Sequence, residues 1–238
     1  MIRYKRRPRA GTVWTAGVRE LGNGGSFIVE KKNWKILFQG DSVTDCGRER
    51  EDSAHLGYGY PKMAAELLAE RHPDQNFTFW NRGISGNRTK DLLARWEEDC
   101  LALQPNLVSI LIGINDTWRR FDANDPTSAA MYEDNYRRLL RAVREKTSAR
   151  ILVIEPFVLP DTPVKDFWRE DLDPKIQACR RVARELADAY LPMDGLFAAA
   201  CMEQPAAHWA ADGVHPTEAG AAFLAKAYVR EAETLLGL

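Results

Sequence analysis

The chain has 238 residues, with 33 Lys and Arg against 34 Asp and Glu, so its formal net charge is −1. Hydrophobic residues make up 45% of the chain and charged residues 28%, a globular composition that excludes an intrinsically disordered protein. The balanced charge gives no overall basic excess for binding nucleic acid. The longest apolar run, residues 196–202, is far shorter than the roughly 20 residues of a membrane-spanning helix. We therefore expect neither nucleic acid nor a membrane as a partner.

Residues 1–34 differ in composition from the rest of the chain. They are rich in glycine, carry basic residues between positions 3 and 9, and contain two short strand-like stretches at residues 11–18 and 26–30. We expect an N-terminal extension that packs on the main domain, residues 35–238, or on a neighbouring subunit, which leaves a homo-oligomer open. The basic residues also suit a polyanion, but no aromatic side chains interleave with them, which favours a solvated arm.

The cysteines and the N-terminal residues indicate the compartment. The four cysteines show no metal-binding spacing, so we expect free thiols in a reducing compartment and no metal site. No apolar segment follows the basic N-terminal residues, so we expect no secretory signal and a cytoplasmic location.

From residue 34 onward, short apolar runs alternate with stretches of helical periodicity. Strands are predicted at residues 35–39, 77–81, 107–112, 150–154 and 190–193. Helices are predicted at residues 60–71, 89–103, 127–146, 173–189 and 217–236. Pro61 suits a first helical turn, and Asp173 suits a cap before Pro174. Strands that are apolar on both faces and alternate with helices predict a parallel sheet sandwiched between helices.

Polar and glycine-rich loops follow the predicted strands, where ligands bind in a parallel sheet. Residues 40–45 are GDSVTD, residues 81–87 are NRGISGN and residues 113–116 are GIND, while residues 212–216 are DGVHP. In this order and at these strand ends, the segments resemble the SGNH (GDSL-type) hydrolase family over about residues 35–238. The longer stretches FQGDSVTDCGR, DLLARWEED and VSILIGINDTWRR resemble its intracellular carbohydrate acetylesterases of the acetylxylan-esterase type.

The resemblance implies a fold and an activity. The fold is the flavodoxin-like SGNH hydrolase fold, a three-layer α/β/α sandwich with a central, mainly parallel five-stranded sheet, in which residues 35–238 form the catalytic domain. The activity is hydrolysis of short acyl esters by a serine esterase, with no cofactor. Ser42 is then the nucleophile, His215 the base and Asp212 its orienting carboxylate. The implied oxyanion donors are the N–H groups of Ser42 and Gly86 and the side-chain amide of Asn115.

Elementary chemistry agrees with these roles. A serine hydroxyl needs a base to act as a nucleophile, and an imidazole that is partly neutral at pH 7 accepts its proton. The three-residue spacing of Asp212 and His215 lets the carboxylate reach one ring nitrogen while the other faces Ser42. This pair also suits a metal ion, but no third ligand stands at a suitable spacing. His55, in the loop after Ser42, stays an alternative base on position alone.

Further polar residues of these loops are expected to support the site rather than react. Asp41, Asp45 and Asp116 are predicted to brace the loops, and Ser85 is predicted to form hydrogen bonds within its own loop. Asp41 is also a candidate substrate contact, together with Trp118, Arg119 and Trp209.

Aromatic and arginine side chains near the cleft suit a sugar face and its hydroxyls, and they suit ordinary packing equally. Residues 210 and 211 separate Trp209 from Asp212, so the direction of the Trp209 side chain stays open. The chain has no long apolar loop for a lipid tail, which favours a small acyl group on a polar alcohol. We therefore expect an acetylated sugar, specifically an O-acetylated xylo-oligosaccharide, as substrate. A thioesterase or lysophospholipase-type acylhydrolase, or a catalytically silent binding module, are the alternatives.

Overall fold

The computed structural model describes residues 31–160 and 163–238, which belong to one compact unit. The N-terminal extension up to residue 30, with both of its predicted strands, lies outside the described residues. Among the helices of the described part, none is both long and apolar enough to cross a membrane.

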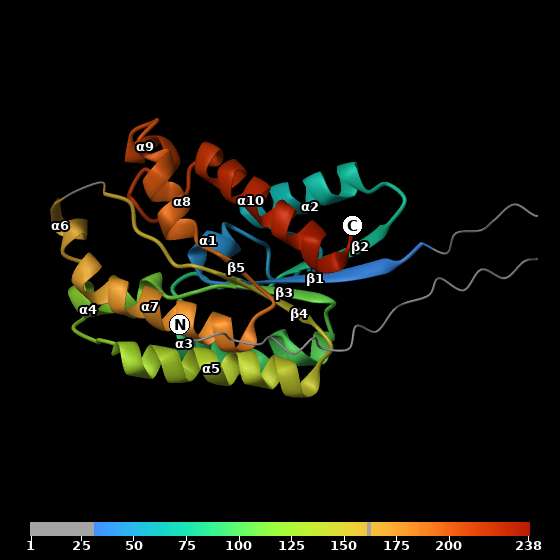
Figure 1. The fold of residues 1–238 in the computed structure, drawn as a ribbon, viewed down its shortest axis with the longest axis horizontal. Coiled ribbons are helices and arrows are strands. Elements are labelled where there is room, and N and C mark those ends of the chain that lie inside the picture. Colours follow the sequence, from blue (N-terminus) through green and yellow to red (C-terminus); the bar gives the residue numbers. More distant parts are fainter. Residues whose placement is uncertain (1–30, 161–162) are drawn as a thin grey trace, which may run out of the picture. The chain divides into compact units, whose positions relative to one another are not determined.

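A sheet of five parallel strands forms the centre of this unit, in the order β2-β1-β3-β4-β5 (Figure 1). The strands are β1 (Asn33–Gly40), β2 (Asn76–Asn81), β3 (Leu107–Leu111), β4 (Arg150–Ile154) and β5 (Ala189–Leu191). Every residue of β3 is buried, because a central strand of a sheet covered on both faces has no solvent side. The predicted parallel sheet is therefore confirmed.

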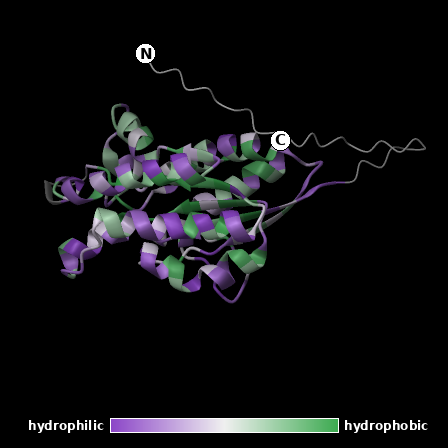
Figure 2. Cartoon of the chain, turned by 60° about the horizontal axis from the view of Figure 1, so that its bottom comes forward, coloured by the Kyte–Doolittle hydropathy of each residue, from purple (hydrophilic) through white to green (hydrophobic). Residues whose placement is uncertain are grey.

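Helices cover both faces of the sheet and complete the three-layer sandwich. On one face lie α2 (Tyr60–Arg71), α8 (Met193–Ala200) and α10 (Glu218–Leu236), and on the other α3 (Thr89–Asp99), α5 (Ala129–Lys146) and α7 (Arg169–Leu186) (Figure 1). Alternate residues of β1 point to opposite faces of the sheet. Ile36 and Phe38 pack into the hydrophobic core on one face, and Leu37 packs into the core on the other face. Figure 2 shows hydrophobic residues along the strands and hydrophilic residues over much of the helices.

Shorter helices stand in the loops of the sandwich. They are α1 (Ser42–Asp45), α4 (Ile114–Asp122), α6 (Pro163–Asp166) and α9 (Ala206–Trp209). The sequence did not predict these helices or α8, because each is too short for helical periodicity to repeat clearly. Since α1 follows β1 and α4 follows β3, both helices begin at the carboxyl ends of neighbouring strands.

Two predicted helices have wrong ends. The helix expected over residues 89–103 ends at Asp99, and a 3₁₀ turn, η1 (Leu101–Leu103), follows it. The helix expected from residue 173 begins at Arg169, so Asp173 lies inside α7 rather than capping it, and Pro174 lies in the second turn. Pro174 cannot donate a backbone hydrogen bond, which costs helix stability. Burial of three apolar side chains at helical spacing, Trp168, Leu172 and Ile176, offsets this loss.

Candidate active site

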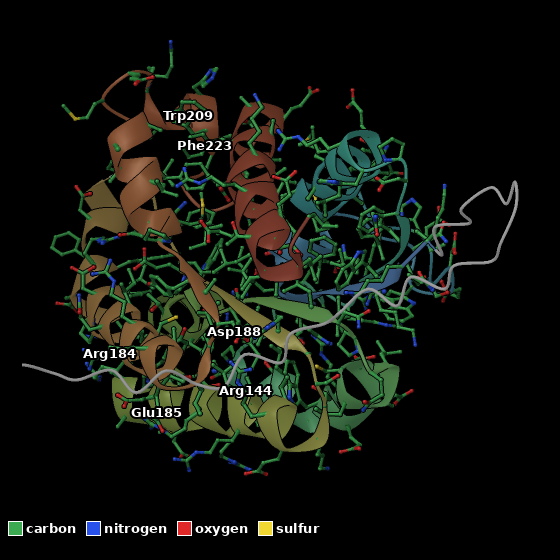
Figure 3. All side chains as sticks on the ribbon, turned by 45° about the vertical axis from the view of Figure 1, so that its right-hand side comes forward. Arg144, Arg184, Glu185, Asp188, Trp209 and Phe223 are labelled. Atoms are coloured by element: carbon green, nitrogen blue, oxygen red, sulfur yellow. The ribbon has the colours of Figure 1, made fainter. Side chains whose placement is uncertain are left out.

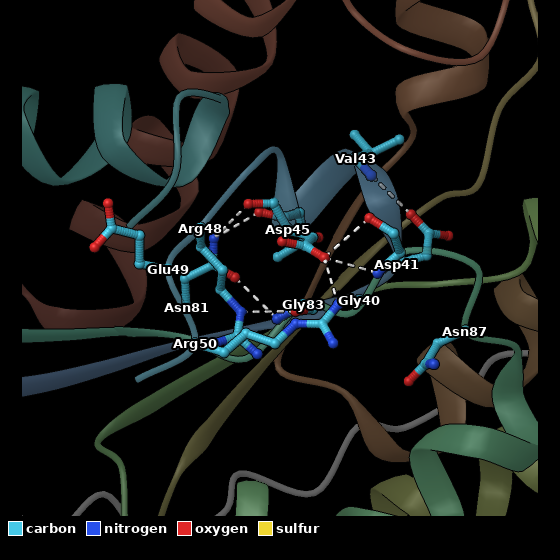
Figure 4. Close-up of polar contacts among 12 residues, drawn as sticks. Gly40, Asp41, Val43, Asp45, Arg48, Glu49, Arg50, Asn81, Gly83 and Asn87 are labelled. Carbon is cyan, nitrogen blue, oxygen red and sulfur yellow. Dashed lines mark hydrogen bonds and ion pairs between the residues drawn. The ribbon is translucent and has the colours of Figure 1, made fainter. Parts of the chain in front are cut away.

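A tight turn from β1 into α1 presents Ser42. A Cβ atom on Gly40, the last residue of β1, would lie 2.3 Å from Thr44 Oγ1 and 2.4 Å from a backbone oxygen of β3, so only glycine fits. The Asp41 carboxylate caps α1 by accepting a hydrogen bond of 3.0 Å from the Val43 N–H (Figure 4). The turn therefore holds Ser42 at the carboxyl end of a central strand.

A chain of hydrogen bonds leads from Ser42 through His215 to Asp212. Ser42 Oγ lies 2.9 Å from His215 Nε2, and His215 Nδ1 lies 2.7 Å from Asp212 Oδ2. The other Asp212 oxygen accepts the backbone N–H groups of His215 at 2.7 Å and of Val214 at 3.0 Å. Because the carboxylate can only accept, Nδ1 carries a proton and Nε2 is left to accept from the serine hydroxyl.

The Asp212 carboxylate is ionised at neutral pH. Partial burial works to raise its pKa, but the hydrogen bonds from the His215 backbone, the His215 ring and the Val214 backbone outweigh that effect. The pKa of Asp212 is thereby lowered to about 2. A carboxylate in this position stabilises the imidazolium that forms when the histidine takes a proton.

Gly86 and Asn115 follow the two strands that flank β1. The loop with Gly86 follows β2, and Asn115 lies in the first turn of α4 after β3. Gly86 has a φ of +83°, which favours glycine, and its N–H has no acceptor among the described residues. The Asn115 amide donates to the Asn87 carbonyl at 3.1 Å. The sheet thus brings Ser42 and the other two candidate oxyanion donors to the same end of three adjacent strands.

Polar side chains fasten the loop after β2 to α1. Asp45 accepts hydrogen bonds from the Ser85 N–H at 2.8 Å and from the Ser85 hydroxyl at 2.9 Å. Asn81 donates to an α1 carbonyl at 2.6 Å and accepts from the Gly83 N–H at 2.9 Å. Arg48 donates to the Gly83 carbonyl at 2.8 Å, and Figure 4 shows Arg48 and Gly83 beside Asp45 and Asn81 at the turn. The loop that carries Gly86 is therefore held against the turn that carries the serine.

Asp116 fastens α4 to the start of α3. Its buried carboxylate accepts the Thr89 N–H at 3.0 Å and the Thr89 hydroxyl at 2.7 Å. Burial raises the pKa of Asp116 to about 6, against the lowering effect of these hydrogen bonds. Burial likewise raises the pKa of Asp41 to about 7, and the neighbouring Asp116 charge adds to the rise. Two carboxyl groups with raised pKa therefore adjoin Ser42 and Asn115 in the chain.

Comparison with known proteins decides the family. Residues 38–223 match the GDSL-like lipase/acylhydrolase family. The chain belongs to this family. It is a carboxylic ester hydrolase, and the family resemblance seen in the sequence is confirmed.

Relatives of the hydrolase support both the fold and the family. An acetylxylan esterase from Geobacillus stearothermophilus is 36% identical over 204 residues, which cover 83% of this chain and 93% of that esterase. The crystal structure of that esterase has a TM-score of 0.77 at 35% identity, covering 83% of this chain and 93% of that chain. A putative GDSL-like lipase from Parabacteroides merdae has a TM-score of 0.81 at 38% identity, covering 86% of this chain and 97% of that chain.

All four histidines of the hydrolase lie in the described part, and only His215 contacts Ser42. His55 Nδ1 accepts the backbone N–H groups of Glu49 at 3.0 Å and Gly57 at 3.3 Å. Its ring therefore braces the loop between α1 and α2. The structure brings His215, and not His55, to the serine of the hydrolase.

Trp118 lies beside the hydrogen-bond chain. The centroid of its ring lies 6.0 Å from that of the His215 ring and 5.0 Å from that of the Trp168 ring. Arg119 follows Trp118 on α4, and its guanidinium pairs with Asp122 at 2.8 Å. Of the candidate substrate contacts, Trp118 is the one whose ring approaches the histidine.

Trp209 and Asp41 are engaged in internal contacts. The Trp209 indole N–H donates to the Ala200 carbonyl at 3.2 Å, and its ring packs against Phe223 at 5.3 Å, as Figure 3 shows. The Asp41 carboxylate is buried and faces the Val43 N–H. Contact between either side chain and a substrate stays a prediction.

A cavity beside Ser42 is lined by residues that the sequence did not single out. Its volume is about 290 Å³, and the side chains around it with Ser42 and His215 include Cys46, Tyr58, Met63 and Glu218. Tyr58 follows the serine segment closely in the chain and Glu218 follows the histidine segment, so proximity to the motifs was the available signal.

The described residues contain no group of three His, Cys, Asp or Glu side chains placed to hold a metal ion. The cysteines are all unpaired thiols, and Cys100 and Cys179 are buried in the core.

Proposed function

We propose that this hydrolase is a serine esterase that removes acetyl groups from O-acetylated sugars, with xylo-oligosaccharides as the substrate class. The observation that carries the proposal is the hydrogen-bond chain from Ser42 to His215 at 2.9 Å and on to Asp212 at 2.7 Å. Such a chain is the arrangement by which a weakly nucleophilic hydroxyl is activated.

The relatives add support for the substrate and for the three residues. The 36% identical relative is an acetylxylan esterase. Variants of that enzyme described as catalytic mutants replace a serine, an aspartate or a histidine by alanine. The aspartate and the histidine of the relative are three positions apart, the same spacing as Asp212 and His215 here.

In the proposed acylation step, His215 Nε2 takes the hydroxyl proton while Ser42 Oγ attacks the ester carbonyl carbon. The negative charge that develops on the carbonyl oxygen is stabilised by the N–H groups of Ser42 and Gly86 and by the Asn115 amide. The carbon–oxygen bond to the alcohol then breaks, and the imidazolium donates its proton to the departing sugar oxygen. Asp212 stabilises the imidazolium between these two transfers.

In the proposed deacylation step, a water molecule takes the place of the alcohol. His215 accepts a proton from this water as it attacks the acetyl carbon bound to Ser42. Collapse of the second tetrahedral intermediate releases acetic acid and restores the serine hydroxyl.

Ser42→Ala tests the nucleophile directly. We expect kcat on acetylated xylose and on p-nitrophenyl acetate to fall by at least about 10⁴-fold, because no other group can form the acyl-enzyme. The matched control is Ser148→Ala, an exposed serine in the loop that leads into β4, away from the carboxyl ends of the strands. Mass spectrometry of the protein treated with a serine-directed phosphonate should show one adduct in the control and none in Ser42→Ala.

The chain length of the preferred acyl group tests the rest of the proposal. We expect acetate esters to be cleaved faster than butyrate esters and far faster than octanoate esters. A preference for octanoate would contradict the carbohydrate assignment while leaving the serine mechanism in place. Full activity in Ser42→Ala would refute the nucleophile.

A further inference from the structure

We propose that the cavity beside Ser42 binds the alcohol half of the ester as an uncharged pyranose ring, with Tyr58 and Glu218 as the residues that select it. The proposal rests on the serine esterase activity proposed above and names the part of the site that chooses the alcohol.

The position of the cavity relative to His215 assigns it to the alcohol. The departing oxygen must receive its proton from His215 Nε2, which lies 2.9 Å from Ser42 Oγ. The alcohol therefore leaves on the histidine side of the serine. The cavity of about 290 Å³ is lined by both Ser42 and His215 and by the residues that directly follow the histidine, Pro216 to Glu218.

The oxyanion donors lie elsewhere. Neither Gly86 nor Asn115 lines the cavity, and both follow the strands on either side of β1. In the tetrahedral intermediate, the reacting carbon is bonded to Ser42 Oγ and its oxyanion points at those donors. The leaving oxygen is then directed to the histidine. The loop after α1 and the first turn of α2, where Tyr58 and Met63 lie, supply another part of the cavity wall.

Tyr58 has the properties of a sugar-stacking residue at the cavity mouth. Its side chain is 65% exposed, yet its backbone is fixed by a hydrogen bond of 2.9 Å from the Tyr58 N–H to the Cys46 carbonyl. The preceding Gly57 has a φ of +77°, and a Cβ atom there would lie 2.4 Å from the Asp45 carbonyl oxygen. An exposed aromatic ring on a fixed backbone can pack on the C–H face of a pyranose with little loss of backbone freedom.

The rest of the lining mixes apolar side chains with the hydroxyls of Tyr60 and Thr217 and with one carboxylate. Val43, Met63 and Ala221 supply apolar surface, and Glu218 is the only acidic or basic residue, apart from His215, along the cavity wall. Glu218 is exposed in the first turn of α10, and its carboxylate forms no hydrogen bond or ion pair with the described residues. Its oxygens are therefore available to accept hydrogen bonds from sugar hydroxyls.

The charge of Glu218 also disfavours negatively charged leaving groups. A phosphorylated or carboxylated leaving group would bring a second negative charge into a cavity whose lining holds no lysine or arginine. Such leaving groups include the coenzyme A of a thioester and the headgroup of a lysophospholipid. An uncharged sugar carries hydroxyls for Glu218 and an apolar face for Tyr58, so it matches the lining.

The test compares two acetyl donors that give the same acetyl-enzyme. One is methyl xylopyranoside carrying a single acetyl group, and the other is ethyl acetate, whose leaving group has no ring to stack on Tyr58. We expect Tyr58→Ala to lower kcat/KM for the acetylated xyloside by about five- to tenfold, with a much smaller change for ethyl acetate. Tyr58→Phe keeps the ring and should restore the activity toward the xyloside.

A second comparison tests the carboxylate. We expect Glu218→Gln to reduce the preference for the acetylated xyloside over an acetylated glucuronide, which carries a negative charge, by about fivefold. An unchanged preference would overturn the role of Glu218 in selection. Loss of xyloside selectivity in Trp118→Ala but not in Tyr58→Ala would overturn the proposal by placing the sugar on the other side of His215.

Acyl chain length distinguishes a cavity that binds the alcohol half of the ester from a cavity that binds the acyl half. If the cavity instead held the acyl group, Met63→Ala would raise the rate on ethyl hexanoate relative to ethyl acetate, and that result would overturn the proposal. We expect the ratio of these two rates to stay within about twofold of the wild-type ratio. Ethyl acetate hydrolysis that survives Ser42→Ala would refute the serine mechanism itself, so the two failures are distinguishable.

Discussion

At the scale of single residues, the pKa values of the carboxyl groups in the site differ because their surroundings differ. Asp212 is partly exposed and accepts three hydrogen bonds, so its pKa falls to about 2 and it stays charged beside His215. Asp41 and Asp116 are buried, and burial raises their pKa to about 7 and about 6. The charged carboxylate therefore faces the histidine, while the two carboxyl groups that hold a proton more tightly lie inside the protein.

Asp116→Asn tests the buried carboxyl. Because burial raises the pKa of Asp116 from 3.8 to about 6, the folded protein keeps a proton that the unfolded chain releases within this window. This contribution to the free energy of unfolding is present below pH 3.8 and is lost as the pH rises through 6. The variant cannot ionise, so its free energy of unfolding relative to the wild type should rise by roughly 2 kcal/mol between pH 4 and pH 7. Urea denaturation of both proteins at the two pH values measures the gain, and an equal stability difference at both would contradict the raised pKa.

At the scale of elements, the site depends on short helices that begin where strands end. The strand-to-helix turn at Gly40 sets the position of Ser42, and the link from Asp116 to Thr89 joins α4 to α3. The loop that carries Gly86 and the helix that carries Asn115 are each tied to a neighbouring element by side-chain hydrogen bonds. The positions of the proposed oxyanion donors therefore follow from contacts between elements rather than from any one loop.

Gly40→Ala tests the turn. The added Cβ would meet Thr44 Oγ1 at 2.3 Å and a backbone oxygen of β3 at 2.4 Å, so β1, β3 or α1 must shift. We expect a loss of about 1–3 kcal/mol in the free energy of unfolding and a fall in kcat/KM as Ser42 moves. The matched control is Gly195→Ala inside α8, where nothing lies within 4 Å of the new Cβ. This control should gain about 0.5–1 kcal/mol. Equal stability of the two variants in denaturant titrations would contradict a tight turn.

At the scale of the whole molecule, all proposed site residues lie between Lys31 and Leu238, in the same compact unit as the sheet. Each of the two helical layers has its own large buried core against one face of the sheet. None of the proposed site residues therefore belongs to the N-terminal extension, and its packing on the main domain or on a neighbouring subunit stays a prediction.

Deletion of residues 1–30 tests this division. We expect the shortened protein to unfold cooperatively and to keep kcat/KM on ethyl acetate within about twofold of the wild type, because it retains the core and the site. Light scattering should show a smaller assembly than the full chain forms. An unchanged mass would refute subunit contact by the extension, and loss of ester hydrolysis would show that the extension contributes to the site.

The sequence by itself determined the sheet, the family and the candidate reacting residues of this protein. Buried parallel strands carry continuous apolar runs, so all five strands were predictable from local composition. The segments around Ser42, Gly86, Asn115 and His215 each stand at a strand end or near the C-terminus, and their order alone was enough to indicate the hydrolase family.

Only the tertiary structure decided which other residues join them. One cavity is lined by Tyr58, Met63 and Glu218, although the segments that carry them are far apart in the chain. No local sequence pattern predicts that these segments lie side by side. The early start of α7 likewise depends on burial of Trp168 against residues of other loops, which outweighs the proline signal. Local propensity is set by neighbours in sequence, whereas the shape and charge of a cavity are set by neighbours in space.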